Sequence, residues 1–364
     1  MSTSPTHRLS DAERAERPVE LLWNAVSAGD EYAAADLLLR LLDEGADPES
    51  ILLDVVARVQ GRVGEEWAAN RMSVAQEHAA TAINERAVAA LSTHPAARTA
   101  ATRGRITVAC VDGEWHGLPA RLLAEVLKLR GWRVDYLGPQ VPTPHLIVHL
   151  HRTSADAVAL SSSIPTRLPT AHAAITACQA IGVPVLVGGA AFGPGGRYAK
   201  PLNADAWAPD ARAAADLLAR EPLPRPQPDH QQLDDLPHLA DQEYTLVSRS
   251  SSSLVREVFT ALEDAFPAVR AYDDVQRERT AEDLAHIVNH LATALYLDDE
   301  ELFTRFVAWT ARVLAARGVP ASSLPPALEL LARELKDFPR AVRILGAGIR
   351  ALVTDHPTPA GITA

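Results

Sequence analysis

Hydrophobic residues recur three and four positions apart along residues 18–94, a spacing that places them on one face of a helix. Gly29, Gly45 and Asn70 interrupt this pattern, each within a short polar stretch typical of a turn. We therefore expect residues 18–95 to form a bundle of about four or five short antiparallel helices.

The pattern changes at residue 104, where short apolar runs rich in β-branched residues begin to alternate with amphipathic segments. This alternation predicts a doubly wound parallel α/β domain over residues 104–221. Ligands of such domains bind beyond the carboxyl ends of the strands. The expected strands are 106–111, 133–137, 155–161, 183–187 and 204–208, and the expected helices lie near 118–130, 143–152, 168–181 and 210–219.

A proline-rich stretch, Pro222–Pro228, predicts a stiff and extended linker, which we place at residues 222–240. Beyond it the hydrophobic spacing is helical as far as Val353, so residues 241–354 are expected to form an all-helical domain. The predicted fold class is thus multidomain α and α/β, with a helical bundle, a parallel α/β domain and a helical C-terminal domain.

Composition narrows the classes of function. The 364 residues carry a formal net charge of -11, so we expect no nucleic-acid partner, because contacts with phosphates need a basic face. Met1–Arg17 contains no apolar signal-peptide core and the chain has no run of about 18 apolar residues, which predicts neither export nor a membrane. Only two cysteines occur, Cys110 and Cys178, as expected of a cytoplasmic protein.

A histidine, His116, follows the first expected strand in the loop Asp112–Pro119. There it would project into the ligand crevice, where a neutral imidazole can bind a transition metal. A lone histidine is more often structural than a ligand. Two further loops strengthen the ligand interpretation, because Ser161–Ser163 and Gly188-Gly189 end the third and fourth strands and are small enough to let a long group pass close to the backbone.

These residues resemble the cobalamin-binding module of methionine synthase and its relatives, whose pattern is Asp-x-His-x-x-Gly, then a serine motif, then Gly-Gly. The resemblance implies that His116 binds cobalt from below and that Glu114 orients its imidazole. It also implies that the channel for the nucleotide tail is lined by Ser161, Ser163, Gly188 and Gly189. This chain departs from the pattern in having Glu114 for aspartate, Pro119 for the closing glycine and a shorter interval between the last two motifs.

The stretch Trp67-x9-Glu77-His78 resembles the capping bundle of the B12-dependent light-responsive transcription repressors. The resemblance implies that Trp67, Glu77 and His78 hold the adenosyl group of adenosylcobalamin and favour it over methylcobalamin. Without that context, the same residues read as a core tryptophan and a solvated Glu-His pair. The repressors carry a second cobalt-binding histidine beside the tryptophan, whereas this chain has Ala68, so we expect its light chemistry to end differently.

The C-terminal domain contains residues that suit a pigment pocket, because arginines can clamp propionates and a histidine can contact pyrrole nitrogens or iron. The histidines taken singly are more often solvated than bound, and the alternative is a bundle for dimerisation or signalling. The candidates are Tyr272, Arg277, Arg279, His286, His290, Arg305 and Trp309.

The order of the three modules resembles the photocobilins, which couple a B12 domain to a globin-like, bilin-binding domain. The resemblance implies a bilin such as biliverdin as a second chromophore. Both cysteines belong to the α/β domain, so we expect the bilin to bind without a covalent bond.

Taken together, these patterns predict a photoreceptor rather than an enzyme, with a light-dependent downstream partner or a homo-oligomeric switch as its output. The alternatives are a corrinoid carrier protein for methyl transfer and a haem-based globin sensor fused to a B12 domain.

Overall fold

The computed structural model describes residues 11–226 and 236–355, and contacts between residues divide the chain into two units. The first unit holds the described residues up to Ser163 and from Ala173 to Pro226, and the second holds Ile164–His172 and the described residues from Leu236 onward. Of the predicted linker 222–240, residues 227–235 lie outside the described residues.

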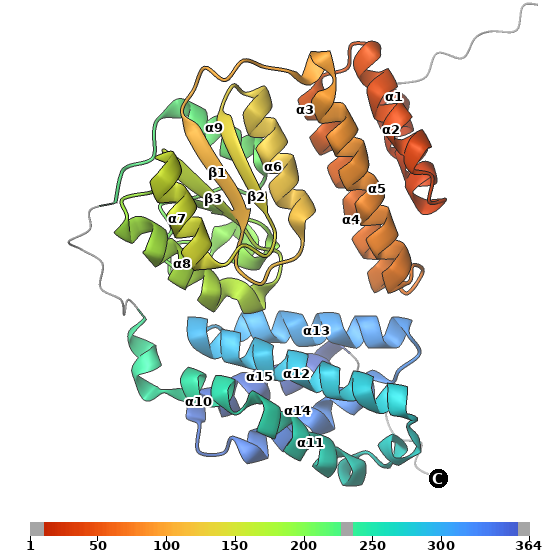
Figure 1. Cartoon of the computed structure of the whole chain (residues 1–364). Coiled ribbons are helices and arrows are strands. Elements are labelled where there is room, and N and C mark those ends of the chain that lie inside the picture. Colours follow the sequence, from red (N-terminus) through yellow and green to blue (C-terminus); the bar gives the residue numbers. More distant parts are fainter. Residues whose placement is uncertain (1–10, 227–235, 356–364) are drawn as a thin grey trace, which may run out of the picture. The chain divides into compact units, whose positions relative to one another are not determined.

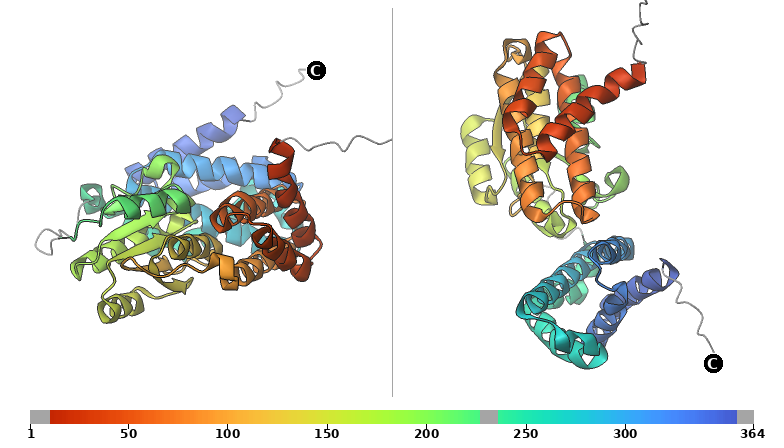
Figure 2. Two further views of the ribbon diagram at one scale, coloured as in Figure 1. Left: turned by 90° about the horizontal axis from the view of Figure 1, so that it is seen from above. Right: turned by 90° about the vertical axis from the view of Figure 1, so that its right-hand side faces the viewer.

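The N-terminal part of the first unit is a helical bundle whose long helices lie side by side (Figure 2). Side chains fix where the helices begin: Asp30 accepts a hydrogen bond from the backbone of α2, and Ser73 with Gln76 forms a capping box at α5. The elements are α1 (Asp11–Ser27), α2 (Glu31–Asp43), α3 (Pro48–Ser50), the π-helix η1 (Ile51–Val56), α4 (Ala57–Ala68), α5 (Val74–Thr93) and the 3-10 helix η2 (Pro95–Ala97).

The α/β part of the first unit contains five parallel strands in the order β2-β1-β3-β4-β5, so the predicted doubly wound domain is confirmed. Helices α6 and α9 pack together on one face of the sheet, and α7 and α8 cover the other (Figure 1). The strands are β1 (Arg105–Cys110), β2 (Arg133–Gly138), β3 (Ala157–Ser161), β4 (Val185–Gly188) and β5 (Ala206–Trp207). The α-helices are α6 (Gly117–Leu129), α7 (Thr143–Thr153), α8 (Leu168–Ala180) and α9 (Ala211–Arg220), and the 3-10 helices are η4 (Ala190–Phe192) and η5 (Pro194–Gly196). A further 3-10 helix, η3 (Pro165–Arg167), and the first residues of α8 belong to the second unit.

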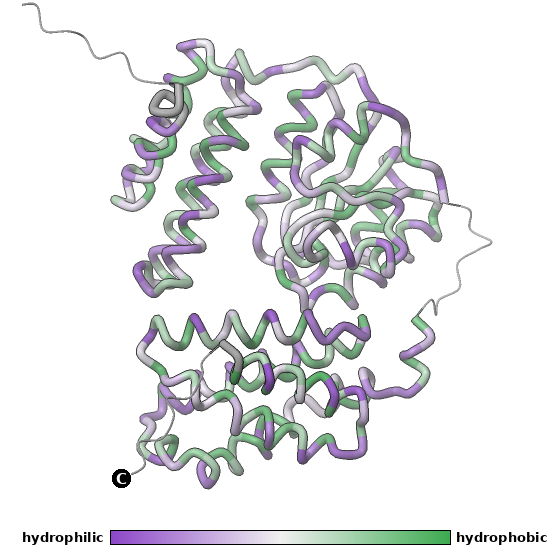
Figure 3. The backbone as a smooth tube through the Cα atoms, turned by 180° about the vertical axis from the view of Figure 1, so that it is seen from behind, coloured by the Kyte–Doolittle hydropathy of each residue, from purple (hydrophilic) through white to green (hydrophobic). Residues whose placement is uncertain are grey.

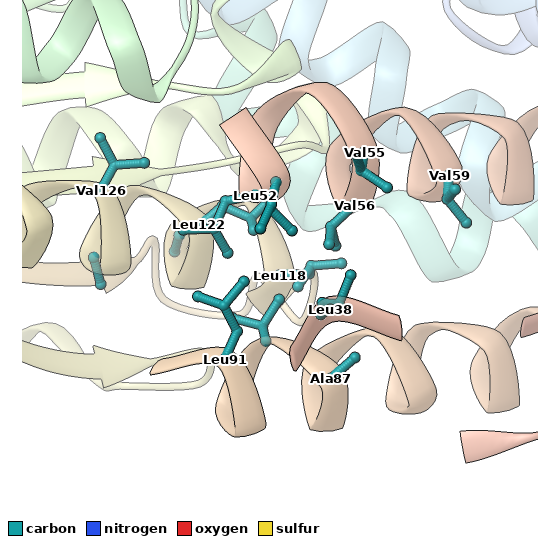
Figure 4. Close-up of a cluster of buried hydrophobic side chains, with 14 of the residues drawn as sticks. Leu38, Leu52, Val55, Val56, Val59, Ala87, Leu91, Leu118, Leu122 and Val126 are labelled. Carbon is teal, nitrogen blue, oxygen red and sulfur yellow. The ribbon is translucent and has the colours of Figure 1, made fainter. Parts of the chain in front are cut away.

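The bundle and the sheet share one hydrophobic core, because α6 packs against both (Figure 4). Leu118 and Leu122 of α6 lie in the same buried cluster as Leu52 of η1 and Leu91 of α5. Burying one leucine side chain stabilises a fold by about 1.5–3 kcal/mol, so this shared cluster is a substantial attachment. The bundle is therefore packed on the α/β domain through a common core and is not a separate module.

The second unit is all-helical, as predicted, and its amphipathic helices show hydrophobic and hydrophilic positions in turn along the chain (Figure 3). Gly348 allows α15 to lie close to α13, since a Cβ atom there would be 2.8 Å from Phe303. Among the described helices, none is both long and apolar enough to cross a membrane. The elements are η7 (Pro237–Asp241), α10 (Glu243–Arg249), α11 (Ser251–Ala265), η8 (Pro267–Ala271), α12 (Asp274–Leu297), α13 (Glu300–Ala316), η9 (Ala321–Ser323), α14 (Leu324–Glu334) and α15 (Pro339–Asp355).

Candidate functional site

The loop between β1 and α6 is held in place by hydrogen bonds from several elements. The Tyr136 hydroxyl of β2 donates to the Gly117 carbonyl at 3.2 Å, and the backbone N–H of Gln140 donates to the Glu114 carbonyl at 3.3 Å. Pro119, where the related pattern has glycine, lies in the first turn of α6, where a missing N–H breaks no helical hydrogen bond. This departure from the pattern is therefore compatible with the helix that follows the loop.

Glu114 is a fully buried carboxylate that organises the loop. Its Oε1 accepts hydrogen bonds from the backbone N–H of His116 at 2.9 Å and from the ring Nδ1 of His116 at 2.7 Å. Its Oε2 accepts from the backbone N–H of Ser163 at 2.7 Å and from the Ser162 hydroxyl at 3.3 Å. Each of these four groups can donate a hydrogen bond, which is the surrounding that a buried carboxylate requires.

When the Nδ1 of His116 donates its proton to Glu114, as the geometry favours, the single-proton form of the imidazole keeps its lone pair on Nε2. The side chain of His116 is 44% exposed although its carboxylate partner is buried. A histidine whose far nitrogen is fixed by a carboxylate is the usual arrangement of a metal-binding imidazole. Burial raises the pKa of the neighbouring Cys110 thiol to about 12, with the charge of Glu114 adding to the effect, so this cysteine does not compete as a thiolate ligand.

A cavity of about 120 Å³ opens at the carboxyl end of β3 and β4. Ser161, Gly188 and Gly189, which the resemblance places along a channel for the nucleotide tail, line this cavity together with Pro119. Ser163 is not among its lining residues, and its backbone N–H contacts Glu114 instead.

The two glycines of the cavity are there for different reasons. A Cβ atom at Gly189 would lie 2.2 Å from the Ser162 carbonyl oxygen, and the residue has a φ of +98°, so backbone packing requires glycine. A Cβ atom at Gly188 would lie 3.3 Å from the Ala208 carbonyl oxygen, in the wall of the cavity. An imidazole oriented by a buried carboxylate, three residues before the Pro119 that lines the cavity, fits a corrinoid that would need a ligand for its cobalt and space for its nucleotide tail.

Trp67 lies at the end of α4, and Glu77 and His78 lie in the first turns of α5. Trp67 is half-buried, and His78 is 71% exposed with its Nδ1 2.7 Å from Glu77 Oε2. The turn between α4 and α5 lies at the same end of the first unit as the carboxyl ends of the strands (Figure 1). The predicted upper and lower residues are thus brought to one end of that unit.

Comparisons with known proteins point the same way. Two family models, each described as a B12 binding domain, match residues 19–92 and 104–217. The HTH-type transcriptional repressor CarA of Myxococcus xanthus is 30% identical over 216 residues, which are 55% of this chain and 69% of the repressor. The chain belongs to the CarA family. It is a cobalamin-binding protein of that family, and the predicted relationship of its first two modules to B12-binding repressors is confirmed.

Corrinoid proteins are among the solved structures that the chain matches, with TM-scores below 0.5. The monomethylamine corrinoid protein of Methanosarcina barkeri is 18% identical and covers 56% of this chain and 97% of its own, with a TM-score of 0.48. A cobalamin-binding protein from Desulfitobacterium hafniense is 20% identical, with the same coverage of both chains and a TM-score of 0.31. The second unit of this CarA relative, from Leu236 onward, lies beyond both family-model matches.

In that second unit His290 is 8% exposed, so the expectation of a solvated side chain is wrong for this residue. Its ring stacks on Phe306, with centroids 3.5 Å apart and planes within 6°, and its Nδ1 donates to the His286 carbonyl at 2.8 Å. Burial lowers the pKa of His290 to about 4, and the imidazole is therefore neutral at pH 7. Trp309 follows Phe306 with a centroid distance of 6.3 Å and is 39% exposed.

The other pigment candidates lie elsewhere or face solvent. His286, Arg279 and Arg305 are exposed. Arg277 donates to Glu263 at 2.6 Å, and it lies about 20 Å from His290 along α12 at 1.5 Å per residue. Half-buried Tyr272 precedes the same end of α12. The candidates therefore fall into one group around His290 and another near Arg277, and no cluster of three metal-binding side chains occurs among the described residues.

Proposed function

We propose that this protein is a light-sensing receptor that binds adenosylcobalamin at the end of the first unit where the α4–α5 turn and the His116 loop lie. The observation that supports this most is the combination of a carboxylate-anchored imidazole with Trp67 and Glu77 at that same end. Adenosylcobalamin, when bound, supplies a cobalt–carbon bond that green or blue light breaks.

Each residue has a distinct task in the proposal. Glu114 holds the Nδ1 proton of His116, so that Nε2 faces the metal. The indole of Trp67 offers a flat apolar surface, and the Glu77 carboxylate can accept hydrogen bonds from ribose hydroxyls. Trp67 and Glu77 would lose the adenosyl group as a bound partner on illumination. The equilibrium between the possible arrangements of the bundle on the α/β domain would then shift, by an amount set by the lost binding energy.

Affinity and hydrodynamics test this function. Full-length apoprotein should bind adenosylcobalamin more tightly than methylcobalamin in the dark, and Trp67→Ala should remove most of that preference while His116 still binds cobalt. Illumination should change both the absorption spectrum and the hydrodynamic radius of the adenosylcobalamin complex. Equal affinity for the two cobalamins, or a stronger one for methylcobalamin, would refute the proposal and favour a carrier for methyl transfer.

We also propose a bilin such as biliverdin as a second chromophore in the second unit. The stacked pair His290 and Phe306 beside a partly exposed tryptophan supports this, because a neutral imidazole among aromatic rings suits a conjugated tetrapyrrole. Burial raises the pKa of both Cys110 and Cys178 to about 12, so neither is a reactive thiolate and the binding is non-covalent.

Reconstitution with biliverdin and with haem tests the second chromophore. A red absorption band that disappears on denaturation and is weakened by His290→Ala would support a bilin. A Soret band after exposure to haem, without any red band from biliverdin, would favour a haem sensor. In the proposal the chain itself catalyses no reaction, and light changes its contacts with a downstream partner or with a second copy, which light-scattering mass measurements in dark and light would reveal.

A further inference from the structure

A chain of side-chain hydrogen bonds runs between α4 and α5 and ends at Glu77. The Asn84 amide donates to Gln60 Oε1 at 2.9 Å, the Gln60 amide donates to the Thr81 hydroxyl at 2.8 Å, and that hydroxyl donates to Glu77 Oε1 at 3.0 Å. Glu77, Thr81 and Asn84 are spaced as neighbours on one face of α5, and Gln60 faces them from α4.

The direction of this chain is fixed by what each group can donate. Thr81 has a single hydroxyl proton, and its oxygen already accepts from the Gln60 amide, so the proton is available for Glu77. Each link therefore points toward the carboxylate, and the chain ends on an acceptor. The Oε1 atom of Glu77 completes it as an acceptor, without a conflict between donors.

The inner end of the chain is unfavourable for stability. Asn84 is fully buried among apolar residues of the bundle, and its Oδ1 has no hydrogen-bond partner. A buried polar atom without a partner costs a protein more than its hydrogen-bonded neighbours return, whereas an apolar side chain at this position would avoid the cost. Stability alone does not account for these polar residues, and the chain that they form ends at the half-buried Glu77.

We infer that Gln60 and Thr81 are positioning residues that hold the Glu77 carboxylate in the orientation that recognises the adenosyl group. The inference rests on the proposed adenosylcobalamin function. Free in solution, a glutamate side chain samples several rotamers, and fixing one oxygen on Thr81 leaves the other, Oε2, beside His78 at the surface of the bundle. Selectivity for the upper ligand thus depends on residues that do not touch it.

The test compares Thr81→Val, which removes the hydroxyl at nearly constant shape, with Thr81→Ser, which keeps it. Dissociation constants of the full chain are measured in the dark for adenosylcobalamin and for hydroxocobalamin, which lacks the adenosyl group. Thr81→Val should weaken adenosylcobalamin binding about five- to tenfold, within the net worth of one intramolecular hydrogen bond, and change hydroxocobalamin binding less than about twofold. Thr81→Ser should restore the wild-type ratio, and Thr93→Val at the far end of α5 is the matched control.

A second pair of variants separates positioning from folding. In a Glu77→Gln background the further loss of the Thr81 hydroxyl should have little additional effect, because the group that it positions is already altered. If Thr81→Val does not fold, Gln60→Met interrupts the chain one step earlier and should give the same selective loss.

The outcomes distinguish this inference from the function on which it rests. A wild-type protein that binds both cobalamins equally refutes the proposed function. A wild-type preference that Thr81→Val leaves intact, or an equal loss for both cobalamins, overturns the positioning role.

Discussion

Replacing Glu114 by glutamine is the most direct test of the cobalt-binding loop, because the side chain keeps its shape and loses its charge. The two carboxylate oxygens accept from N–H groups on different loops, Oε1 from His116 and Oε2 from Ser163. A glutamine has one oxygen and one NH₂ group at these positions. Whichever way the amide is turned, its NH₂ group faces a backbone N–H that cannot turn away.

The magnitude follows from that conflict. Leaving a buried donor without an acceptor costs about 1–3 kcal/mol, and removing the outer partner of a metal-binding histidine typically weakens metal affinity by a factor of about 10–100. We therefore expect the dissociation constant for hydroxocobalamin to rise about 10–100-fold in Glu114→Gln, which corresponds to about 1.4–2.7 kcal/mol. The fraction of complex with His116 bound to cobalt should fall in parallel.

The assay is a titration of full-length apoprotein followed by absorption, with the cobalt–nitrogen bond checked by electron paramagnetic resonance of the reduced complex carrying ¹⁵N-histidine. Glu125→Gln is the matched control, because Glu125 is a buried glutamate of α6 that pairs with Arg121 and Lys128 instead of the loop. Glu114→Asp keeps the charge and should give an intermediate affinity. If Glu114→Gln binds within twofold of wild type and keeps the histidine on cobalt, the carboxylate does not orient that imidazole.

Three further predictions concern stability and packing. The pKa of His290 is about 4 in the folded protein and near 6.5 in the unfolded chain. Because the unfolded chain therefore binds the extra proton, the free energy of unfolding should fall by about 2 kcal/mol from pH 7 to pH 5. His290→Phe should remove this component of the pH dependence in urea unfolding, and an unchanged pH dependence would contradict the burial of His290. Gly182→Ala should cost only the roughly 1–2 kcal/mol of an alanine in a left-handed conformation, because nothing lies near its new Cβ atom. Gly189→Ala should destabilise the first unit by more than this, because its Cβ atom also meets a backbone oxygen. Equal losses of stability in the two variants would exclude that clash. Arg130→Met should destabilise the first unit by about 1–3 kcal/mol, because it leaves the Glu49 carboxylate, whose pKa Arg130 holds low, without its closest partner. Adding Glu49→Gln should recover part of this loss. If Arg130→Met leaves the free energy of unfolding unchanged, the ion pair does not stabilise the fold.

Local patterns were sufficient to predict the elements of both units. Turn residues at Gly29, Gly45 and Asn70 separate helices that do end there, and β-branched runs coincide with the strands to within about two residues at most ends. The residues proposed for the cobalt side could be selected because His116, Ser161 and Gly188 lie at or just after the carboxyl ends of parallel strands, which such sheets bring together.

What the patterns missed depends on tertiary contacts between distant residues. Nothing local marks Ser162 as a hydrogen-bond donor to Glu114, since 48 residues separate them. The sequence alone favours a solvated His290, but packing of α13 against α12 places Phe306 over its ring and buries it. Gln60 and Thr81 read as ordinary polar positions of two helices until the pairing of α4 with α5 is known.

The shared core also determines how the bundle could move. Helix α6 begins at the His116 loop and ends beside Arg130, which donates two hydrogen bonds to Glu49 of the bundle. Glu49 and Trp67 belong to one continuous helical run, so at 1.5 Å per residue they lie about 27 Å apart. The ion pair thus holds the bundle to the α/β domain at the end remote from Trp67. If the bundle moves away from the His116 loop, as proposed, it can pivot near that ion pair or slide along the apolar side of α6. Pivoting near Arg130 would keep the apolar contacts closest to the ion pair and separate those of Leu118 at the opposite end of α6, whereas sliding would break contacts along the whole helix. We therefore expect the proposed opening to pivot at the ion pair, and substitutions at Arg130 to alter the motion without touching His116.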